Sequence, residues 1–291
     1  WISVWTAVAA LALAAVSYAS SLVPALGEGL LPPALAIACV ALFTLINMRG
    51  AQAAGAVQIV TTTLKLLPLI AVAVVALVSL EHGDAAASTA PTPVSISGIA
   101  AVAALAMFAM LGFECATLPA GKVENETRVV PLATMVGTLI AGLVTLGACA
   151  AVLFLLPGDV AAKSAAPFAD AISPLLGDAA GTLIALFALI SALGALNGWI
   201  LCSGEVPLSM AEARVFPRWF GETTALGTPV RAQVVSSLIA AALLAANYSR
   251  SLAGIFTFMI LVSTVSALVL YGAAALAALK MRVAVIASLA G

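Results

Sequence analysis

Apolar residues run through this chain in blocks about as long as a bilayer is thick, with short polar segments between them. A transmembrane helix needs about 20 mostly apolar residues. By this measure the pattern predicts eight membrane-spanning helices. They cover residues 4–23, 34–48, 53–79, 99–118, 130–156, 179–204, 230–247 and 252–279, and a ninth apolar run begins at residue 283. The predicted fold class is therefore an all-α membrane protein, a multi-spanning helical bundle.

The segments between the predicted spans are of two kinds. Residues 80–98 and 157–178 are rich in Ala, Pro, Ser and Asp, and we expect them to be outer loops. Residues 119–129 and 205–229 carry mixed charge, and we expect them to be inner loops. Within the last segment, residues 209–220 alternate small, charged and aromatic side chains. That pattern indicates a short helix lying at the inner membrane surface.

Composition agrees with a membrane location. Apolar residues make up 64% of the chain and charged residues 8%, against about 45 to 50% and 25% in soluble domains. The basic residues also orient the protein, because inner loops hold an excess of Lys and Arg. Eight lie in predicted inner loops and two in outer loops: Arg49, Lys122, Arg128, Arg214, Arg218, Arg231, Lys280 and Arg282 against Lys163 and Arg250. We expect a multi-pass protein of the plasma membrane, in particular a bacterial inner membrane.

Glu114 stands beside a glycine in the middle of the apolar run 99–118. A carboxylate at that depth costs roughly 2.5 to 3.5 kcal/mol or more, so it usually faces a polar cavity on a substrate or ion path. Gly112 indicates a local break in the helix, which is tolerated at that depth only where backbone lines a cavity. The pattern favours a transporter. The alternative is a protonated carboxyl group bonded to a neighbouring helix for structural reasons.

Lys65 lies about twelve residues from the inner end of the span 53–79, one turn after Thr61 and Thr62. Burial would lower its pKa, because the charged form loses solvation, and such a lysine can exchange a proton during transport. The alternative is a side chain that reaches back to the interface. At about 1.5 Å per residue that reach is long.

Two aromatic residues and one hydroxyl could face the same ligand. Phe108 lies shortly before Glu114, Trp199 lies in the middle of the span 179–204, and Ser263 lies in the eighth span. Aromatic residues in that position are more often core packing. Serine hydroxyls in spans commonly bond to their own helix.

Two other classes of function fit the sequence poorly. A membrane enzyme needs a nucleophile and a base that converge, yet the single histidine, His82, lies in a predicted loop and no G-x-S-x-G motif occurs. A channel needs a continuous polar-lined pore, and the spans contain few polar positions. We expect no enzyme activity, no cofactor, no metal site and no nucleic-acid partner. The expected partners are a small amino acid substrate and the lipid bilayer, with a homodimer as a possible assembly.

Several segments resemble the motifs of one transporter superfamily. GFECATLPAGKVENETRVVP at residues 112–131 resembles its sixth-helix motif, in which a G-hydrophobe-E step leads to an N-P-x-R-x-x-P loop, although Glu126 replaces the first proline. Residues 164–181 and 193–201 resemble the region of its seventh and eighth helices, and residues 215–232 resemble its inner loop before helix nine. The chain is identified as a member of the amino acid, polyamine and organocation superfamily. It is similar there to the bacterial basic amino acid and polyamine antiporters.

The resemblance implies an inverted-repeat fold of the leucine-transporter type, with twelve helices and two repeats of five. This chain would hold helices three to ten and the start of eleven, as a single transmembrane transporter domain over residues 1–291. Residues 1–80 would end the first repeat and residues 99–280 would form the second. Because the chain starts at Trp1 and stops within an apolar run at Gly291, we expect it to be truncated at both ends.

The resemblance also implies roles for individual residues. The implied substrate-binding positions are Phe108 as the gating aromatic, the unwound backbone of Ala109, Met110, Leu111 and Gly112, the helix-eight aromatic Trp199, the hydroxyl of Ser263, and Val8. The implied proton-coupling positions are Glu114, as the buried carboxylate, and Lys65, where some proton-dependent members place a lysine instead of a sodium ion.

Val8 bears on the substrate, because arginine exchangers of the superfamily have an asparagine at that position. A less polar pocket makes a neutral or modestly sized amino acid at least as well supported as arginine. The expected function is secondary active transport of amino acids by exchange or proton coupling, with alternating access. Antiport of polyamines and basic amino acids is the alternative.

Overall fold

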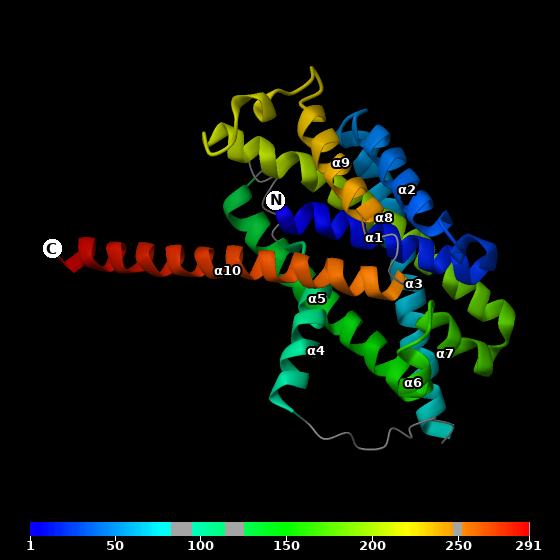
Figure 1. The fold of residues 1–291 in the computed structure, drawn as a ribbon. Coiled ribbons are helices and arrows are strands. Elements are labelled where there is room, and N and C mark those ends of the chain that lie inside the picture. The colour runs from blue at the N-terminus through cyan, green and yellow to red at the C-terminus, as the bar shows by residue number, and fades with distance from the viewer. Residues whose placement is uncertain (83–94, 114–124, 247–251, 291) are drawn as a thin grey trace.

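A computed structural model describes residues 1–82, 95–113, 125–246 and 252–290 of the chain. Within these ranges the chain forms helices joined by turns and no β-strand (Figure 1). The helices are α1 (Ile2–Leu22), α2 (Leu31–Asn47), α3 (Ala51–His82), α4 (Ile96–Ala109), α5 (Glu126–Leu155), α6 (Gly158–Ala161), α7 (Pro167–Leu176), α8 (Asp178–Glu212), α9 (Val230–Ala246) and α10 (Leu252–Ala290), with 3-10 turns η1 (Pro24–Gly27) and η4 (Arg218–Gly221). The all-α prediction is confirmed.

The long apolar helices lie where the hydrophobic pattern predicts spans. In the described part of the chain, four segments are long and apolar enough to cross a membrane: α1, α5, α8 and residues 254–281 of α10. Shorter apolar helices are α2, α4, α9 and residues 68–79 of α3. The chain therefore carries the helices of a multi-pass membrane protein.

The segment 157–178, predicted as a loop, contains α6 and α7. Pro167 occupies the first position of α7, where its fixed φ suits a helix start and its missing N–H costs nothing. Gly177, with φ +85°, ends the helix in a conformation that disfavours other residues. Turn residues at both ends thus enclose a helix in a segment whose composition suggested a loop.

The prediction of a short surface helix over residues 209–220 is wrong. Residues 209–212 are the last turn of α8, the chain then turns through Arg214 at φ +59°, and only the 3-10 turn η4 follows. Pro217 precedes η4 and cannot continue a helix from α8, because its ring blocks the hydrogen bond of the preceding turn.

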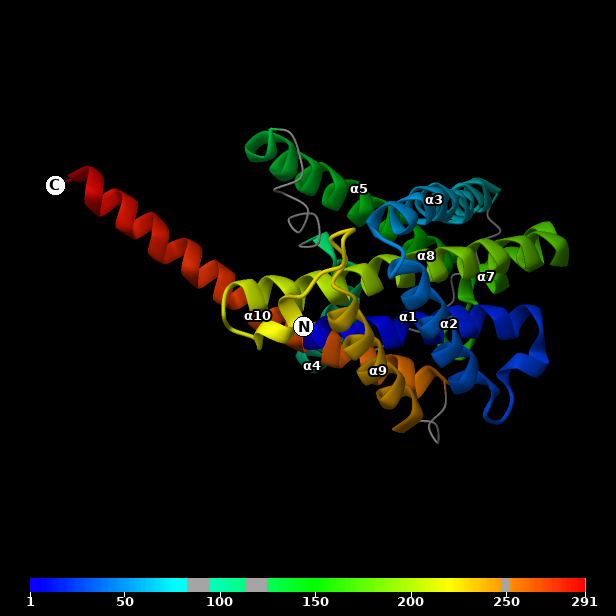
Figure 2. The same cartoon turned by 90° about the horizontal axis from the view of Figure 1, so that it is seen from above.

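The predicted start of a separate span at residue 283 is also wrong. Residues 283–290 continue α10, which forms one helix of 39 residues. Residues 273–290 contain neither Gly nor Pro, and Lys280 and Arg282 are compatible with a helix. The C-terminal part of α10 extends away from the other helices in both views (Figures 1 and 2).

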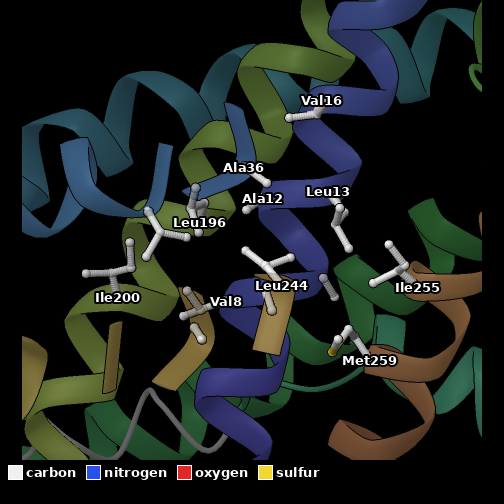
Figure 3. Packing of buried hydrophobic residues seen from close by; sticks show 14 of the residues in the cluster. Val8, Ala12, Leu13, Val16, Ala36, Leu196, Ile200, Leu244, Ile255 and Met259 are labelled. Carbon is white, nitrogen blue, oxygen red and sulfur yellow. The ribbon is translucent and has the colours of Figure 1, made fainter. Parts of the chain in front are cut away.

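The apolar core surrounds α1, which packs against α2, α8, α9 and α10. Its buried residues come from all five helices, and Figure 3 shows them converging. The largest that are fully buried are Leu13, Leu196, Ile200, Leu244, Ile255, Met259, Val8 and Val40. Ala9, Ala10 and Ala12 of α1 are completely buried. Small residues at such positions let helices approach closely, which matters in a bilayer because lipid supplies no hydrophobic force between helices.

The ends of α1 and α8 show that the two helices are antiparallel. The Trp1 ring lies 5.1 Å from the Phe216 ring and 5.9 Å from the Phe220 ring, both beyond the end of α8. At the other end of α1, the Ser17 hydroxyl donates to the Ala165 carbonyl, 2.9 Å away and before the start of α8. The N-terminus of α1 therefore lies on the same face as the loop from α8 to α9, as the basic residues predict.

Candidate functional site

Helix α4 ends just before Gly112, where the sequence predicts a break, and residues 114–124 lie outside the described part. Helix α4 ends at Ala109, and the next two residues form tighter bonds, from Met110 N–H to the Met107 carbonyl (3.0 Å) and from Leu111 N–H to the Phe108 carbonyl (3.1 Å). Gly112 follows with φ +109°. This conformation is open to glycine because it has no side chain to clash with the backbone. The sequence therefore stops the helix inside an apolar run.

Trp199 of α8 lies directly against this break. A Cβ atom placed on Gly112 would lie 3.5 Å from Cζ2 of the Trp199 ring, which is ordinary van der Waals contact. Two positions that are 87 residues apart in sequence, and that were predicted to share a ligand, are thus adjacent. Because Gly112 has no side chain, its backbone can approach the indole ring closely.

Aromatic contacts fix the break on the side of α10. The rings of Phe108 and Phe256 meet edge to face, with centroids 6.5 Å apart. The rings of Phe113 and Tyr271 are stacked, with centroids 5.1 Å apart. Such pairs add about 0.5 to 1.5 kcal/mol beyond the area that they bury. Sequence reasoning missed Phe256 and Tyr271, because an aromatic residue within a span gives no sign of its partner.

Helix α5 contributes the third wall of this site. The Met110 Cε atom lies 3.5 Å from the position that a Cβ atom on Gly142 would take. The break is therefore in contact with α5, α8 and α10 but stays partly exposed: Met110, Leu111 and Gly112 are half-buried, and Phe113 is exposed. The last carbonyl groups of a helix carry the negative end of its dipole. The end of α4 thus presents a partial negative charge beside aromatic rings, an arrangement that suits an ammonium group.

Ser263 and Val8 lie inside the core, and Phe108 and Trp199 pack against the core cluster that contains Val8. The buried Ser263 hydroxyl donates to the Ser3 carbonyl of α1 at 2.7 Å. Val8 is buried among apolar side chains and lies near Leu244 in Figure 3. Their roles in ligand binding stay predictions.

Of the two predicted proton-coupling residues, Glu114 lies outside the described residues. Lys65 lies within α3, and its side chain is also outside the described part. One turn earlier, Thr61 of α3 packs so closely on α8 that a Cβ atom on Gly194 would overlap its side chain. Residue 65 therefore lies one helical turn after a close contact between α3 and α8.

No group of three or more His, Cys, Asp and Glu residues that could hold a metal ion occurs in the part of the chain that the structure describes. The site around Gly112 is built from backbone, aromatic rings and a thioether.

The chain belongs to the amino acid permease family, whose pattern it matches over residues 1–285. It is therefore a multi-pass membrane protein of that family.

The cadaverine/lysine antiporter of Escherichia coli K12 is 34% identical over 134 residues, which are 46% of this chain and 30% of the relative. The putative arginine/ornithine antiporter of Bacillus subtilis 168 is 29% identical over 171 residues, 59% of this chain and 36% of the relative. The putrescine transporter PotE of Escherichia coli K12 is 28% identical over 161 residues, 55% of this chain and 37% of the relative. The matched region spans about a third of the length of these relatives.

Proposed function

We propose that this protein is a secondary active transporter of amino acids that works by alternating access in a bacterial inner membrane. The observation that carries the proposal is the break at Gly112 against Trp199, in a chain of the amino acid permease family. Broken helices at membrane depth supply backbone groups for substrate binding in secondary transporters. The ligand would lie beside residues 109–112, with Phe108 and Trp199 as aromatic walls.

The dipole at the end of α4 favours a substrate with an ammonium group. Amino acids and polyamines share that group, and three relatives are named for cadaverine and lysine, for arginine and ornithine, and for putrescine. Aromatic rings next to the break add attraction for a cation. The apolar Val8 favours a neutral or modestly sized amino acid as the principal substrate. Antiport of basic amino acids and polyamines is the second candidate, and the relatives support it.

The helix pairs support the proposed inverted repeats. Helix α3 packs along α8 as α10 packs along α1, and α2 contacts α8 as α9 contacts α1. Exchanging α1 with α8, α2 with α9 and α3 with α10 therefore maps each of these pairs onto another. Such matched pairing is expected when two repeats are related by a two-fold axis. On this basis residues 1–80 end one repeat and residues 99–280 form the other.

Counterflow in liposomes tests the proposal. The reconstituted protein is loaded with one unlabelled amino acid or polyamine, and uptake of labelled substrate is measured. We expect saturable uptake that internal substrate accelerates, with alanine, leucine, lysine, arginine, cadaverine and putrescine compared as competitors. Competition by lysine, arginine and the polyamines, without competition by alanine or leucine, would favour the second candidate. Uptake that rises linearly with concentration and ignores internal substrate would show that the protein is not a carrier.

We also propose that Lys65 and Glu114 exchange protons during the cycle. Lysine and glutamate at membrane depth change charge readily, because burial disfavours the charged form. Lys65→Ala should abolish the pH dependence of transport while the protein still folds. Transport that keeps its wild-type profile between pH 5 and 8 in this variant would exclude Lys65 from proton coupling.

A further inference from the structure

Four buried polar atoms in the described part of the chain have no hydrogen-bond partner. They are Asn47 Oδ1, Thr228 Oγ1, and both Nε2 and Oε1 of Gln233. Asn47 and Gln233 are completely buried, and Thr228 is 4% exposed. The large majority of buried side-chain polar atoms are bonded, to protein or to ordered water. Four unpaired atoms on three neighbouring residues therefore indicate a ligand.

Two contacts show that these residues lie together. The Thr44 hydroxyl of α2 bonds to the Ser237 hydroxyl of α9 at 2.7 Å. Further along, a Cβ atom on Gly50 would lie 3.9 Å from Thr228 Oγ1. Residue numbers rise along α2 while they fall along α9, so the two helices are antiparallel. On α2, Asn47 lies halfway between the two contact positions Thr44 and Gly50. On the opposite segment, the position halfway between Ser237 and Thr228 is at residues 232–233. By this spacing we place Gln233 opposite Asn47.

The position of Gln233 is fixed from the side of α8. A Cβ atom on Gly204 would overlap Cγ of Gln233 and lie 3.0 Å from Cγ of Pro229. The aliphatic part of Gln233 thus packs directly on Gly204 of α8, which leaves its side chain no room to shift toward α8. This contact holds the Gln233 side chain between α9 and α8.

The hydrogen-bonding capacity of these atoms selects the ligand. Asn47 Nδ2 donates to the Phe43 carbonyl (2.8 Å) and to Asn197 Oδ1 (2.9 Å), so its Oδ1 is the remaining acceptor. Gln233 offers one acceptor oxygen and an NH2 donor, and the Thr228 hydroxyl can do either. A metal cation would use the oxygens alone and would be repelled by the NH2 group. A small molecule that both donates and accepts satisfies all of them.

We propose that ordered water binds at this site and bridges Asn47 of α2 to Gln233 of α9, with Thr228 at its outer edge. Buried water usually makes about three hydrogen bonds to polar groups that would otherwise be unpaired. The site is distinct from the break at Gly112, and it does not depend on what the protein transports. Water would thus take part in holding α2, α8 and α9 together at the face where the loop from α8 to α9 lies.

Isosteric variants test the proposal by the sign of a stability change. If water binds, Gln233→Met and Thr228→Val remove its partners, so each should lower the Tm in nanodiscs by about 2 to 4 °C. The double variant should lose less than the sum, because both changes disrupt one water site. If no water binds, each change removes unpaired buried atoms and should raise the Tm. A rise in both single variants therefore overturns the proposal.

Thr6→Val is the matched control, since Thr6 is a buried threonine whose hydroxyl bonds to the Ile2 carbonyl of its own helix at 2.8 Å. It should change the Tm less than Thr228→Val does. A high-resolution map of the wild-type protein gives a second readout that needs no variant. We expect solvent density within hydrogen-bond distance of both Asn47 and Gln233. A direct bond between these two amides, or a Tm that rises in sodium or potassium chloride but not in choline chloride, overturns the water assignment.

Discussion

The region around α1 and the region around α4 are built differently. Helix α1 has eleven fully buried residues and contacts four other long helices. Helix α4 has none, and it ends three residues before Gly112, which lies against the Trp199 ring. Interiors that are closely packed cannot deform gradually. The comparison shows that the region around α1 is a closely packed scaffold, whereas α4 is lightly packed against the described helices.

Hydrogen bonds strengthen the contrast. Side chains link α1 to α10, α2 to α9, α2 to α8, and the start of α1 to α9; the pairs are Ser263–Ser3, Thr44–Ser237, Asn47–Asn197 and Trp1–Ser236. In bilayers, interhelical hydrogen bonds contribute about 0.6 kcal/mol on average. Around the break at Gly112, the described ring contacts are Phe108 with Phe256 and Phe113 with Tyr271.

Gly194→Leu should lower stability the most, because it disrupts the packing of α3 against α8. Even a Cβ atom there overlaps the Thr61 side chain, so the helices must separate. We expect a loss of about 3 kcal/mol, seen as loss of folded protein on size-exclusion chromatography. Gly137→Leu on α5 is the control, since nothing lies within 4 Å of that position. Equal yields of the two variants would show that the α3–α8 contact is not tight.

Leu196→Ala should come next, because it opens a cavity in the core. Leu196 is completely buried, whereas Leu139 of α5 is 64% exposed. Since lipid is as apolar as the core, only the packing part of the usual cost applies, about 2 kcal/mol. Thermal unfolding in nanodiscs should show a lower Tm for Leu196→Ala and little change for Leu139→Ala. Similar shifts in both would remove the distinction between scaffold and lipid-facing surface.

Gly112→Ala should damage transport more than folding. The new side chain is strained at φ +109°, by about 1 to 3 kcal/mol. The break would then shift relative to Trp199. We expect the Tm to fall slightly while counterflow in liposomes falls several-fold. Gly147→Ala, which has no neighbour within 4 Å, should affect neither. Full transport by Gly112→Ala would mean that the break does not need this conformation.

Ser263→Ala should have the smallest effect on the scaffold. It removes one hydrogen bond to Ser3 and should cost about 1 kcal/mol. Thr264→Val is the comparison, since the Thr264 hydroxyl bonds only within its helix among the bonds described, to the Ile260 carbonyl at 2.8 Å. If substrate binding weakens in Ser263→Ala while the Tm stays constant, Ser263 serves the ligand rather than the scaffold.

Much of the fold could be predicted from the hydrophobic pattern, because a bilayer requires each span to be long, apolar and helical. The spans and the all-α class follow from that requirement, and the break was indicated separately by Gly112 in an apolar run that also holds Glu114. Helices α6 and α7 do not, because the Ala, Pro, Ser and Asp content of their segment is typical of a loop, and the length of α10 does not, because Lys280 and Arg282 are typical of an inner loop. For the site, the sequence indicated Phe108, Gly112 and Trp199 but not Phe256, Tyr271 or Gly142.

By itself, the sequence determined that this chain crosses a membrane repeatedly, which family it resembles, and where a helix must stop. These properties depend on local composition and on a glycine without a side chain. Only the tertiary structure decided that Trp199 lies against Gly112, that Val8 and Ser263 lie in the core, and that Asn47 bonds to Asn197. Such contacts join residues far apart in the chain, and they depend on how helices pack, a property that no single segment encodes.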